Sequence, residues 1–377
     1  MRLLSTHMPS EDIGTVVTVD GRIDPDEVGV TTTHEHLFLD AAEAWFELPD
    51  EAQAREVATD PISLDNLWYV RRNPQQHRDN LQLTSMEEAI TEVNYFQRAG
   101  GDTVVDVTPK AVGCDPKRVR GIARQTGLNI VHGTAYYTKA SHPDRFESQS
   151  QDELGDTLED EFVSDVVDGI DDTDVRAGIV GEIGLSDTIY PDEEAALRAG
   201  ARAARRTGAS LTIHPPGRTP ESQRNRTYPT SRWALEVLDI VEEEGLPPGR
   251  VIMDHMDRTI YEDLEYQYDL AERGAYLEYD VWGLEVYLEN YNDSYPSDTW
   301  RAEAVCDLID RGYASQLVFG QDVYTKTQRR KYGGYGYGHL LENIVPMLKE
   351  RGVDQDVLDR IFVDNPRDVL TFVDPEP

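Results

Sequence analysis

The sequence predicts a (β/α)8 TIM barrel, and three observations support that fold class. Eight short runs rich in β-branched and other apolar residues recur along the 377 residues. Longer segments with apolar residues at helical spacing separate these runs, an alternation typical of a parallel sheet covered by helices. No glycine-rich phosphate loop follows an early strand, which counts against a doubly wound open sheet, the competing architecture. We therefore expect a single barrel domain over residues 1–377.

Each expected strand is a short apolar run bounded by turn-forming residues. In chain order the strands are expected at 29–36, 102–109, 129–137, 176–184, 209–216, 249–257, 275–283 and 316–323. Helices are expected at 84–100, 193–208, 232–245, 261–274, 300–312 and 338–352. The first helix starts with a capping box, either Thr84 with Glu87 or Ser85 with Glu88. Pro346 is expected to bend or interrupt the last one.

Two connections are too long for an ideal barrel. Residues 37–83 are rich in acids and tryptophan, and residues 138–175 form the second long stretch. Connections of this length usually serve as active-site lids or irregular insertions. We expect both on the active-site side of the barrel.

The charge composition is extreme. The chain has 72 acidic and 36 basic residues, a net charge of −36, and an isoelectric point near 4.5. The acids are scattered among apolar runs, which indicates a folded protein with an acidic surface and is typical of halophilic proteins that work in multimolar salt. Nucleic acid is excluded as a partner, because phosphate binding requires positive charge.

The remaining composition points to the cell interior. Two cysteines, Cys114 and Cys306, form no CxxC motif and no disulfide framework. No run approaches 18 apolar residues, and no apolar signal segment opens the chain. We expect a cytoplasmic protein with no membrane partner that acts on a small molecule, alone or as a homodimer.

Side chains of the types that bind metal ions lie at the ends of five predicted strands. A pair of histidines, one residue apart, projects from one face of the first strand because strand side chains alternate. The full set is His34, His36, Glu182, His214, His255 and Asp322. A single histidine at a strand end is usually structural, but the carboxyl ends of barrel strands converge on one mouth. The set is therefore expected to surround one site.

The number of ligands favours two metal ions. Six ligands are too many for one catalytic zinc, which takes three protein ligands and water. They suit two divalent cations that share a carboxylate and a hydroxide. We expect zinc, with manganese or cobalt as alternatives.

Several segments together resemble the phosphotriesterase-related (phosphotriesterase homology) branch of the amidohydrolase superfamily. They are TVDGRIDPDEVGVTTTHEHLFLD, GIVGEIG, TIHPP, VIMDHMDR, GQDVYTKTQRRKYGGYGYGHLLENIVP and DNPRDVL, within residues 13–373. The resemblance implies that His34, His36 and Asp322 hold a buried ion. It assigns His214 and His255 to an exposed ion. Branches that hydrolyse organophosphates or acyl-homoserine lactones place a carbamylated lysine where this chain has Glu182, so the bridge is expected to be a plain carboxylate, as in the homology branch.

The expected activity follows from this centre. A metal-bridging hydroxide attacks a carbonyl or phosphoryl group, and Asp322 acts as the general acid–base catalyst that passes the proton to the leaving group. We expect a lactonase or esterase acting on a small anionic metabolite. The alternatives are an N-acyl amide hydrolase, a phosphoester or phosphotriester hydrolase, and a non-catalytic metal-binding barrel.

Candidate substrate-binding residues lie in the loops. Tyr137, after the third strand, matches a lactonase tyrosine that faces the leaving group, or it packs in the ordinary way. Asp280 binds a substrate hydroxyl or supports the metal ligands. A basic stretch after the eighth strand, with Lys326, Arg330 and Lys331, is expected to bind a phosphate or carboxylate. The alternative is a solvated loop whose cations pair with surface acids.

Overall fold

The computed structural model describes residues 10–216, 233–258, 260, 264–288 and 293–376. Eight parallel strands form one sheet in the order β14-β11-β10-β9-β8-β7-β6-β3. They are β3 (Thr31–Glu35), β6 (Thr103–Asp106), β7 (Asn129–Thr134), β8 (Ile179–Gly184), β9 (Leu211–His214), β10 (Val251–Met253), β11 (Tyr276–Tyr279) and β14 (Leu317–Phe319). Each lies within a predicted range.

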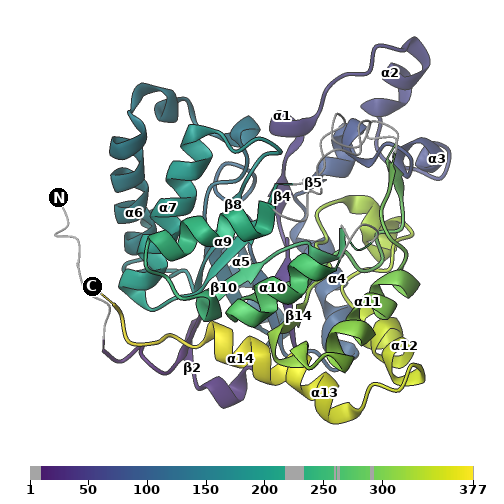
Figure 1. The fold of residues 1–377 in the computed structure, drawn as a ribbon. Coiled ribbons are helices and arrows are strands. Elements are labelled where there is room, and N and C mark those ends of the chain that lie inside the picture. The colour runs from purple at the N-terminus through teal and green to yellow at the C-terminus, as the bar shows by residue number, and fades with distance from the viewer. Residues whose placement is uncertain (1–9, 217–232, 259, 261–263, 289–292, 377) are drawn as a thin grey trace.

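The two edge strands meet and nearly close the barrel. The backbone N–H groups of Gln321 and Asp322, just beyond β14, donate to the carbonyl of His34 in β3 at 3.3 and 3.0 Å. Helices surround the central strands, as Figure 1 shows. The predicted (β/α)8 barrel is confirmed.

The helices that cover the barrel follow the strands in turn. They are α4 (Met86–Arg98), α5 (Pro116–Thr126), α6 (Gln151–Val167), α7 (Pro191–Thr207), α9 (Trp233–Glu243), α10 (Glu265–Arg273), α11 (Asp298–Asp310) and α12 (Val345–Glu350). Ser85, not Thr84, caps α4, because its hydroxyl accepts the N–H of Glu88 at 3.3 Å. A π-helical turn, Leu340–Ile344, precedes α12, and Pro346 lies in the first turn of that helix. The predicted interruption therefore falls where proline is tolerated. Residue 232 and residues 261–263 of two predicted helices lie outside the described residues.

Helices α5 and α6 were not predicted. The side chain of Asp115 caps α5, Pro116 opens it, and Gly127 ends it in the left-handed conformation. Helix α6 lies inside the 138–175 stretch, so much of that stretch is the barrel helix between β7 and β8. Its buried face carries leucine, phenylalanine and valine and packs against α7.

The first long connection holds several short elements. They are β4 (Leu39–Asp40), α1 (Ala42–Trp45), α2 (Ala52–Ala58), α3 (Leu67–Val70) and β5 (Gln82–Leu83), and β4 pairs with β5. Figure 1 shows α1, α2 and α3 along one side of the barrel. The other elements are β1 (Val16–Thr18), β2 (Gly21–Ile23), β12 (Tyr287–Leu288), β13 (Asp293–Ser294), α13 (Gln355–Asp359) and α14 (Asn365–Leu370).

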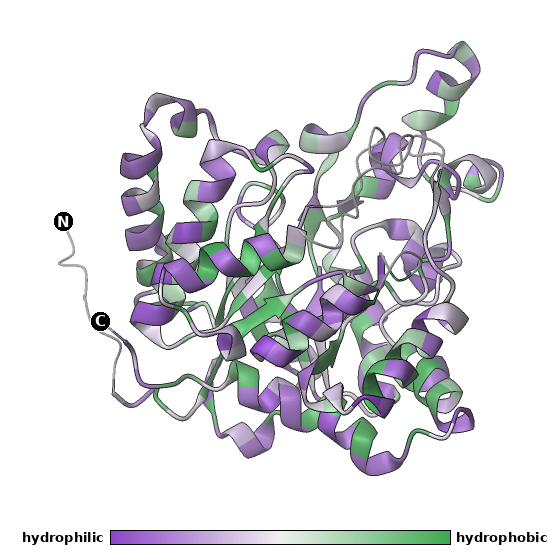
Figure 2. Ribbon diagram, viewed as in Figure 1, coloured by the Kyte–Doolittle hydropathy of each residue, from purple (hydrophilic) through white to green (hydrophobic). Residues whose placement is uncertain are grey.

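The core lies between strands and helices. Figure 2 shows hydrophobic strands at the centre and hydrophilic outer faces on the helices. The strand residues are buried almost throughout, so the barrel forms a rigid frame for what its strand ends carry. No described helix combines the length and the apolar character that crossing a bilayer requires.

Candidate metal centre

The strand ends bring the six predicted metal ligands together. His34 lies in β3 and His36 directly follows it, Glu182 lies in β8, and His214 ends β9. His255 and Asp322 follow β10 and β14 within three residues. All six side chains are buried. A parallel barrel collects these residues because its strands end at the same rim.

One half of the centre lies between β3, β8 and β14. His34 Nε2 is 3.6 Å from Glu182 Oε1, and His36 Nε2 is 3.3 Å from Asp322 Oδ1. Ligand atoms of His34, His36 and Glu182 lie within 4.8 Å of one another, close enough to hold one cation. Asp322 Oδ1 is also 3.9 Å from His34 Nε2.

The other half lies between β8, β9 and β10. His214 Nδ1 is 3.1 Å and His255 Nε2 is 3.3 Å from the same Glu182 Oε1 atom. The two ring nitrogens are 2.8 Å apart. Glu182 thus belongs to both halves, as a bridging carboxylate would.

The donor atoms fit divalent metal ions. His34 Nε2 is buried, faces Glu182, and has no hydrogen-bond partner among the described residues. The opposite ring nitrogens are occupied: Nδ1 of His34 by Glu278 at 3.2 Å and Nδ1 of His36 by Thr108 at 3.0 Å. Metal-binding histidines typically make such a contact through the second nitrogen, which fixes the ring orientation.

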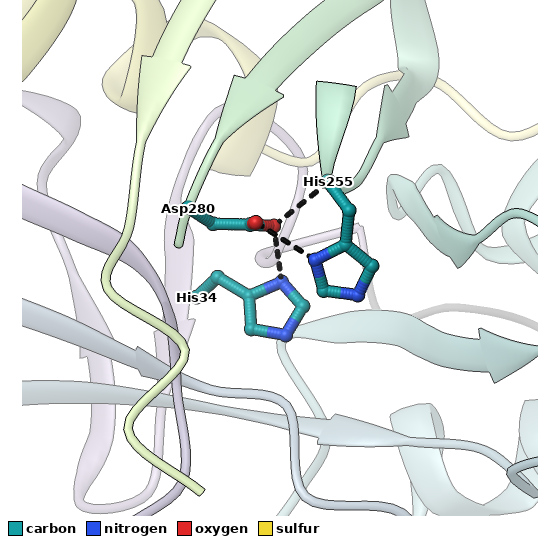
Figure 3. Close-up of side chains that lie close together, drawn as sticks. All are labelled: His34, His255 and Asp280. Carbon is teal, nitrogen blue, oxygen red and sulfur yellow. Dashed lines mark hydrogen bonds and ion pairs between the residues drawn. The ribbon is translucent and has the colours of Figure 1, made fainter. Parts of the chain in front are cut away.

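Asp280 makes the corresponding contact with His255. Figure 3 shows its carboxylate pointing at two histidine rings: Oδ1 is 2.7 Å from His255 Nδ1 and Oδ2 is 3.3 Å from His34 Nδ1. Ligand atoms of Asp280, His34 and His255 also lie within 4.8 Å of one another. This position favours the supporting role over the substrate role that the sequence left open.

Two further acids lie behind the site, and the sequence analysis missed both. Asp254 precedes His255, and Glu278 lies in β11, two residues before Asp280, which directly follows that strand. Burial raises the pKa of Glu182 well above its usual range, and the charges of Asp254 and Asp322 raise it further. Burial also raises the pKa of Glu278 to about 7. So many buried carboxyls at one point favour bound cations.

The surroundings of His214 and His255 favour the neutral form that binds metals. Burial lowers the pKa of His214 and His255 well below the usual value, and the positive charge of Arg258 lowers both further. Arg258 ends a 3-10 turn, Met256–Arg258, directly after His255. The sequence analysis did not identify it.

The backbone at the site is conformationally unusual. His255 has φ 58° and Asp322 has φ 44°, left-handed values that residues other than glycine rarely adopt. Strain of this kind is concentrated at functional sites and costs about 1–3 kcal/mol per residue. Gly320 permits the approach of β14 to β3, because a Cβ there would lie 2.8 Å from the backbone nitrogen of His34.

Aromatic side chains stand beside the centre. The hydroxyl of Tyr137 lies 2.8 Å from His214 Nδ1, so this predicted residue does reach the site. Trp45, from α1, packs with its ring centroid 5.5 Å from that of Tyr137. At Trp45 the 37–83 connection therefore lies beside the candidate metal centre, and its role as an active-site loop stays a prediction.

Three of the four cations in the basic stretch each pair with a carboxylate. Lys326 Nζ is 2.5 Å from Asp79, and Lys331 Nζ is 2.5 Å from Glu88. Arg330 pairs with Glu342. These contacts favour the alternative of a loop whose cations meet acids, and anion binding by Lys326, Arg330 and Lys331 stays a prediction.

Comparisons with known proteins agree with the fold. The model of the phosphotriesterase family matches residues 14–370. An N-acetyltaurine hydrolase from Dictyostelium discoideum is 35% identical over 386 residues, covering 97% of this chain and 100% of that protein. A resiniferatoxin-binding protein from Rhodobacter sphaeroides is 35% identical, with a TM-score of 0.88 over 97% of this chain and 98% of the other. A lactonase from Listeria monocytogenes is 25% identical, with a TM-score of 0.73 over 95% and 99%.

Proposed function

The chain belongs to the phosphotriesterase family, and we propose that it is a binuclear metal-dependent hydrolase of small N-acyl amides that carry an acidic group. The observation that carries the proposal is the Glu182 oxygen shared by two histidine groups. The N-acetyltaurine hydrolase relatives, at 35% identity over nearly the full length, favour the amide among the substrates that such a centre serves. This choice replaces the lactone as first candidate.

His34, His36 and Asp322 would hold one ion, His214 and His255 the other, and Glu182 would bridge them. Divalent cations, in our proposal zinc, would lower the pKa of water and polarise the carbonyl oxygen of the amide. The chain supplies the rest of the chemistry. Asp280, Glu278 and Thr108 orient the histidine rings through their outer nitrogens.

Asp322 is the proposed proton carrier. Amide cleavage adds water across the C–N bond, and the departing nitrogen must gain a proton. Asp322 Oδ1 lies 3.3 Å from His36 Nε2, at the edge of the centre, and the side chain is 8% exposed. A carboxylate there can take a proton from water and deliver it to the leaving amine.

The lactone stays a second candidate on one specific observation. The Listeria lactonase shares the fold over nearly the whole chain. A lactone carbonyl needs the same attack and the same proton transfer as an amide, so the metal centre does not separate the two substrates.

The test is hydrolysis in multimolar KCl with added Zn²⁺ or Mn²⁺. The panel contains N-acetyltaurine, N-acetyl amino acids, sugar lactones with and without a phosphate, homoserine lactones and a phosphotriester. His34→Asn serves as the blank. Turnover of N-acyl amides above the blank supports the proposal, and turnover of lactones alone replaces it. If folded protein with two bound metal ions hydrolyses no substrate class, the non-catalytic metal-binding barrel is the remaining alternative.

A further inference from the structure

We propose that Arg258 binds the acidic group, a sulfonate or carboxylate, of the substrate and so selects anionic N-acyl amides. This inference rests on the proposed function, because it names the part of that site that recognises the substrate. It starts from an electrostatic problem. A chain of net charge −36 repels anions, so an anionic substrate needs a positive group at the site itself.

The position of Arg258 is fixed by the chain next to it. Its backbone N–H donates to the carbonyl of His255 at 3.0 Å, which closes the turn immediately after a proposed metal ligand. The neighbouring Asp257 is directed elsewhere: its Oδ2 accepts from Arg301 Nε and from the backbone N–H of Val281, both at 3.0 Å. Arg301 is therefore the direct ion-pair partner of Asp257, which leaves the guanidinium of Arg258 without that contact.

The guanidinium of Arg258 is half-buried and lacks an acidic partner. Its Nε is buried without a hydrogen bond, and within the described ranges no carboxylate forms an ion pair with it. Burial opposes the charged form of Arg258, and the charges of Asp322 and Asp280 are among those that raise its pKa from a distance. Neither carboxylate forms an ion pair with it in the described part of the chain, so a bound anion would supply the direct partner. Arginine suits the task, because its fork of N–H donors matches the geometry of an acid group.

The charge of Arg258 acts on the rim of the metal centre. It lowers the pKa of both His214 and His255, though burial lowers these more. The charge of Arg258 also acts on Tyr137 and Tyr295. Burial raises the pKa of each tyrosine, and the charge of Arg258 opposes the rise. The Nε atom of Arg258 is shielded from solvent, so the base of its guanidinium lies inside the protein and not out on the surface. An acyl amide whose carbonyl meets the metals would direct its acid group toward this cation.

The basic stretch is the competing anion site. Three of its four cations, Lys326, Arg330 and Lys331, already face a carboxylate of Asp79, Glu88 or Glu342. The fourth, Arg329, is fully buried and donates to the backbone carbonyl of Leu37 at 3.0 Å. A substrate would have to displace those acids, whereas Arg258 has no described acid to displace.

The experiment compares charged and neutral substrates in metal-loaded wild type and Arg258→Gln. The substrates are N-acetyltaurine, N-acetyl-β-alanine and the neutral N-acetyl-2-aminoethyl methyl sulfone. For Arg258→Gln we expect KM for the two acids to rise about 30-fold, the loss of one charged hydrogen-bonding partner, while KM for the sulfone stays constant. Arg258→Lys should recover part of the loss. Arg311→Gln, which removes a paired charge at the far end of α11, is the matched control.

A binding measurement separates this inference from the proposed function. Calorimetric titration with taurine requires no turnover, and Arg258→Gln should bind it about 30-fold more weakly than wild type. If wild type hydrolyses no amide but shows this difference, the amide hydrolase proposal fails and the anion site stands. Three outcomes would overturn the inference. In Arg258→Gln, KM could rise equally for the acids and the sulfone, or it could stay unchanged for all of them. Alternatively, the selective rise of KM for the acids could occur in Lys331→Gln instead. Wild type that binds no taurine would also overturn it.

Discussion

The carboxylate of Asp280 holds His255 at two points. Its Oδ1 lies 2.7 Å from the ring Nδ1, and its Oδ2 accepts the backbone N–H of His255 at 3.0 Å. The ring is thereby turned so that Nε2 faces His214 and Glu182. A single aspartate thus sets both the ring and the unusual backbone of a proposed metal ligand.

Asp280→Asn should weaken metal binding. The amide keeps the shape of the side chain but loses the charge that strengthens His255 as a ligand, and such losses reduce affinity about 10- to 100-fold. Competition with a chromophoric chelator measures the affinity. Asp310→Asn, an exposed change on α11, is the control. If Asp280→Asn binds metal as tightly as wild type, Asp280 does not support His255 as a metal ligand.

Asp322→Asn and His34→Asn should separate proton transfer from metal binding. Without the carboxylate of Asp322 we expect turnover to fall about 10²- to 10⁴-fold, a range typical of a lost general acid–base group, with a smaller effect on metal content. His34→Asn should lower both. Elemental analysis and kcat are measured on the same samples. Asp322→Asn protein that loses metal as completely as activity would make Asp322 a ligand only.

Removal of metal should destabilise the protein. Glu182, Asp254 and Glu278 are buried together, and burial raises the pKa of all three. Bound cations offset this repulsion, and a ligand at 100 times its Kd stabilises the native state by about 2.7 kcal/mol. Thermal unfolding with zinc or with chelator measures the difference, which Glu182→Gln should reduce. Identical curves for wild type in both conditions would argue against the metal centre.

Glu159 should make stability depend on pH through the contact of α6 with α7. Arg202 and Arg206 each donate to its carboxylate at 2.5 Å. Burial raises the pKa of Glu159, but these hydrogen bonds outweigh burial and hold it below the usual value. A depressed pKa contributes stability at neutral pH that is lost as pH falls below the ordinary glutamate value of about 4.3.

Glu159→Gln should therefore lose about 1.5–3 kcal/mol of unfolding free energy at pH 7, the range for hydrogen bonds to charged groups. The difference from wild type should disappear toward pH 3. Denaturant unfolding between pH 3 and 7 gives both curves. Asp156→Asn, exposed on the same helix, is the control. A constant difference across this range would assign the effect to packing instead of charge.

Multimolar KCl should stabilise the protein. Raising ionic strength from 0.1 M to 1 M shortens the screening length from about 10 Å to about 3 Å, which weakens the self-repulsion of a chain of net charge −36. We expect the unfolding temperature to rise with KCl and to respond less to sucrose. A fall with KCl would show that surface pairs such as Arg124–Asp20 outweigh the repulsion, and would contradict the halophilic interpretation.

Helices α5 and α6 show where sequence reading fell short. The segment of α6 reads as an acidic connection, yet Leu154, Leu158 and Phe162 recur along one buried face. The function of that face is clear only once α7 is seen to pack on it, because a polar helix is stabilised by its packing partner more than by its own helix propensity. Asp115, Pro116 and Gly127 were a readable signal for α5.

The sequence by itself determined the barrel and the six candidate ligands. Alternation along a strand and position at a strand end are local properties, so they can be read residue by residue. Only the tertiary structure decided which of the cations contact an acidic side chain. Lys326 and Lys331 meet Asp79 and Glu88, more than 240 residues earlier in the chain, while the Nε atom of Arg258 has no hydrogen-bond partner among the described residues. Electrostatic interactions depend on distance through space, and a linear sequence does not give that distance.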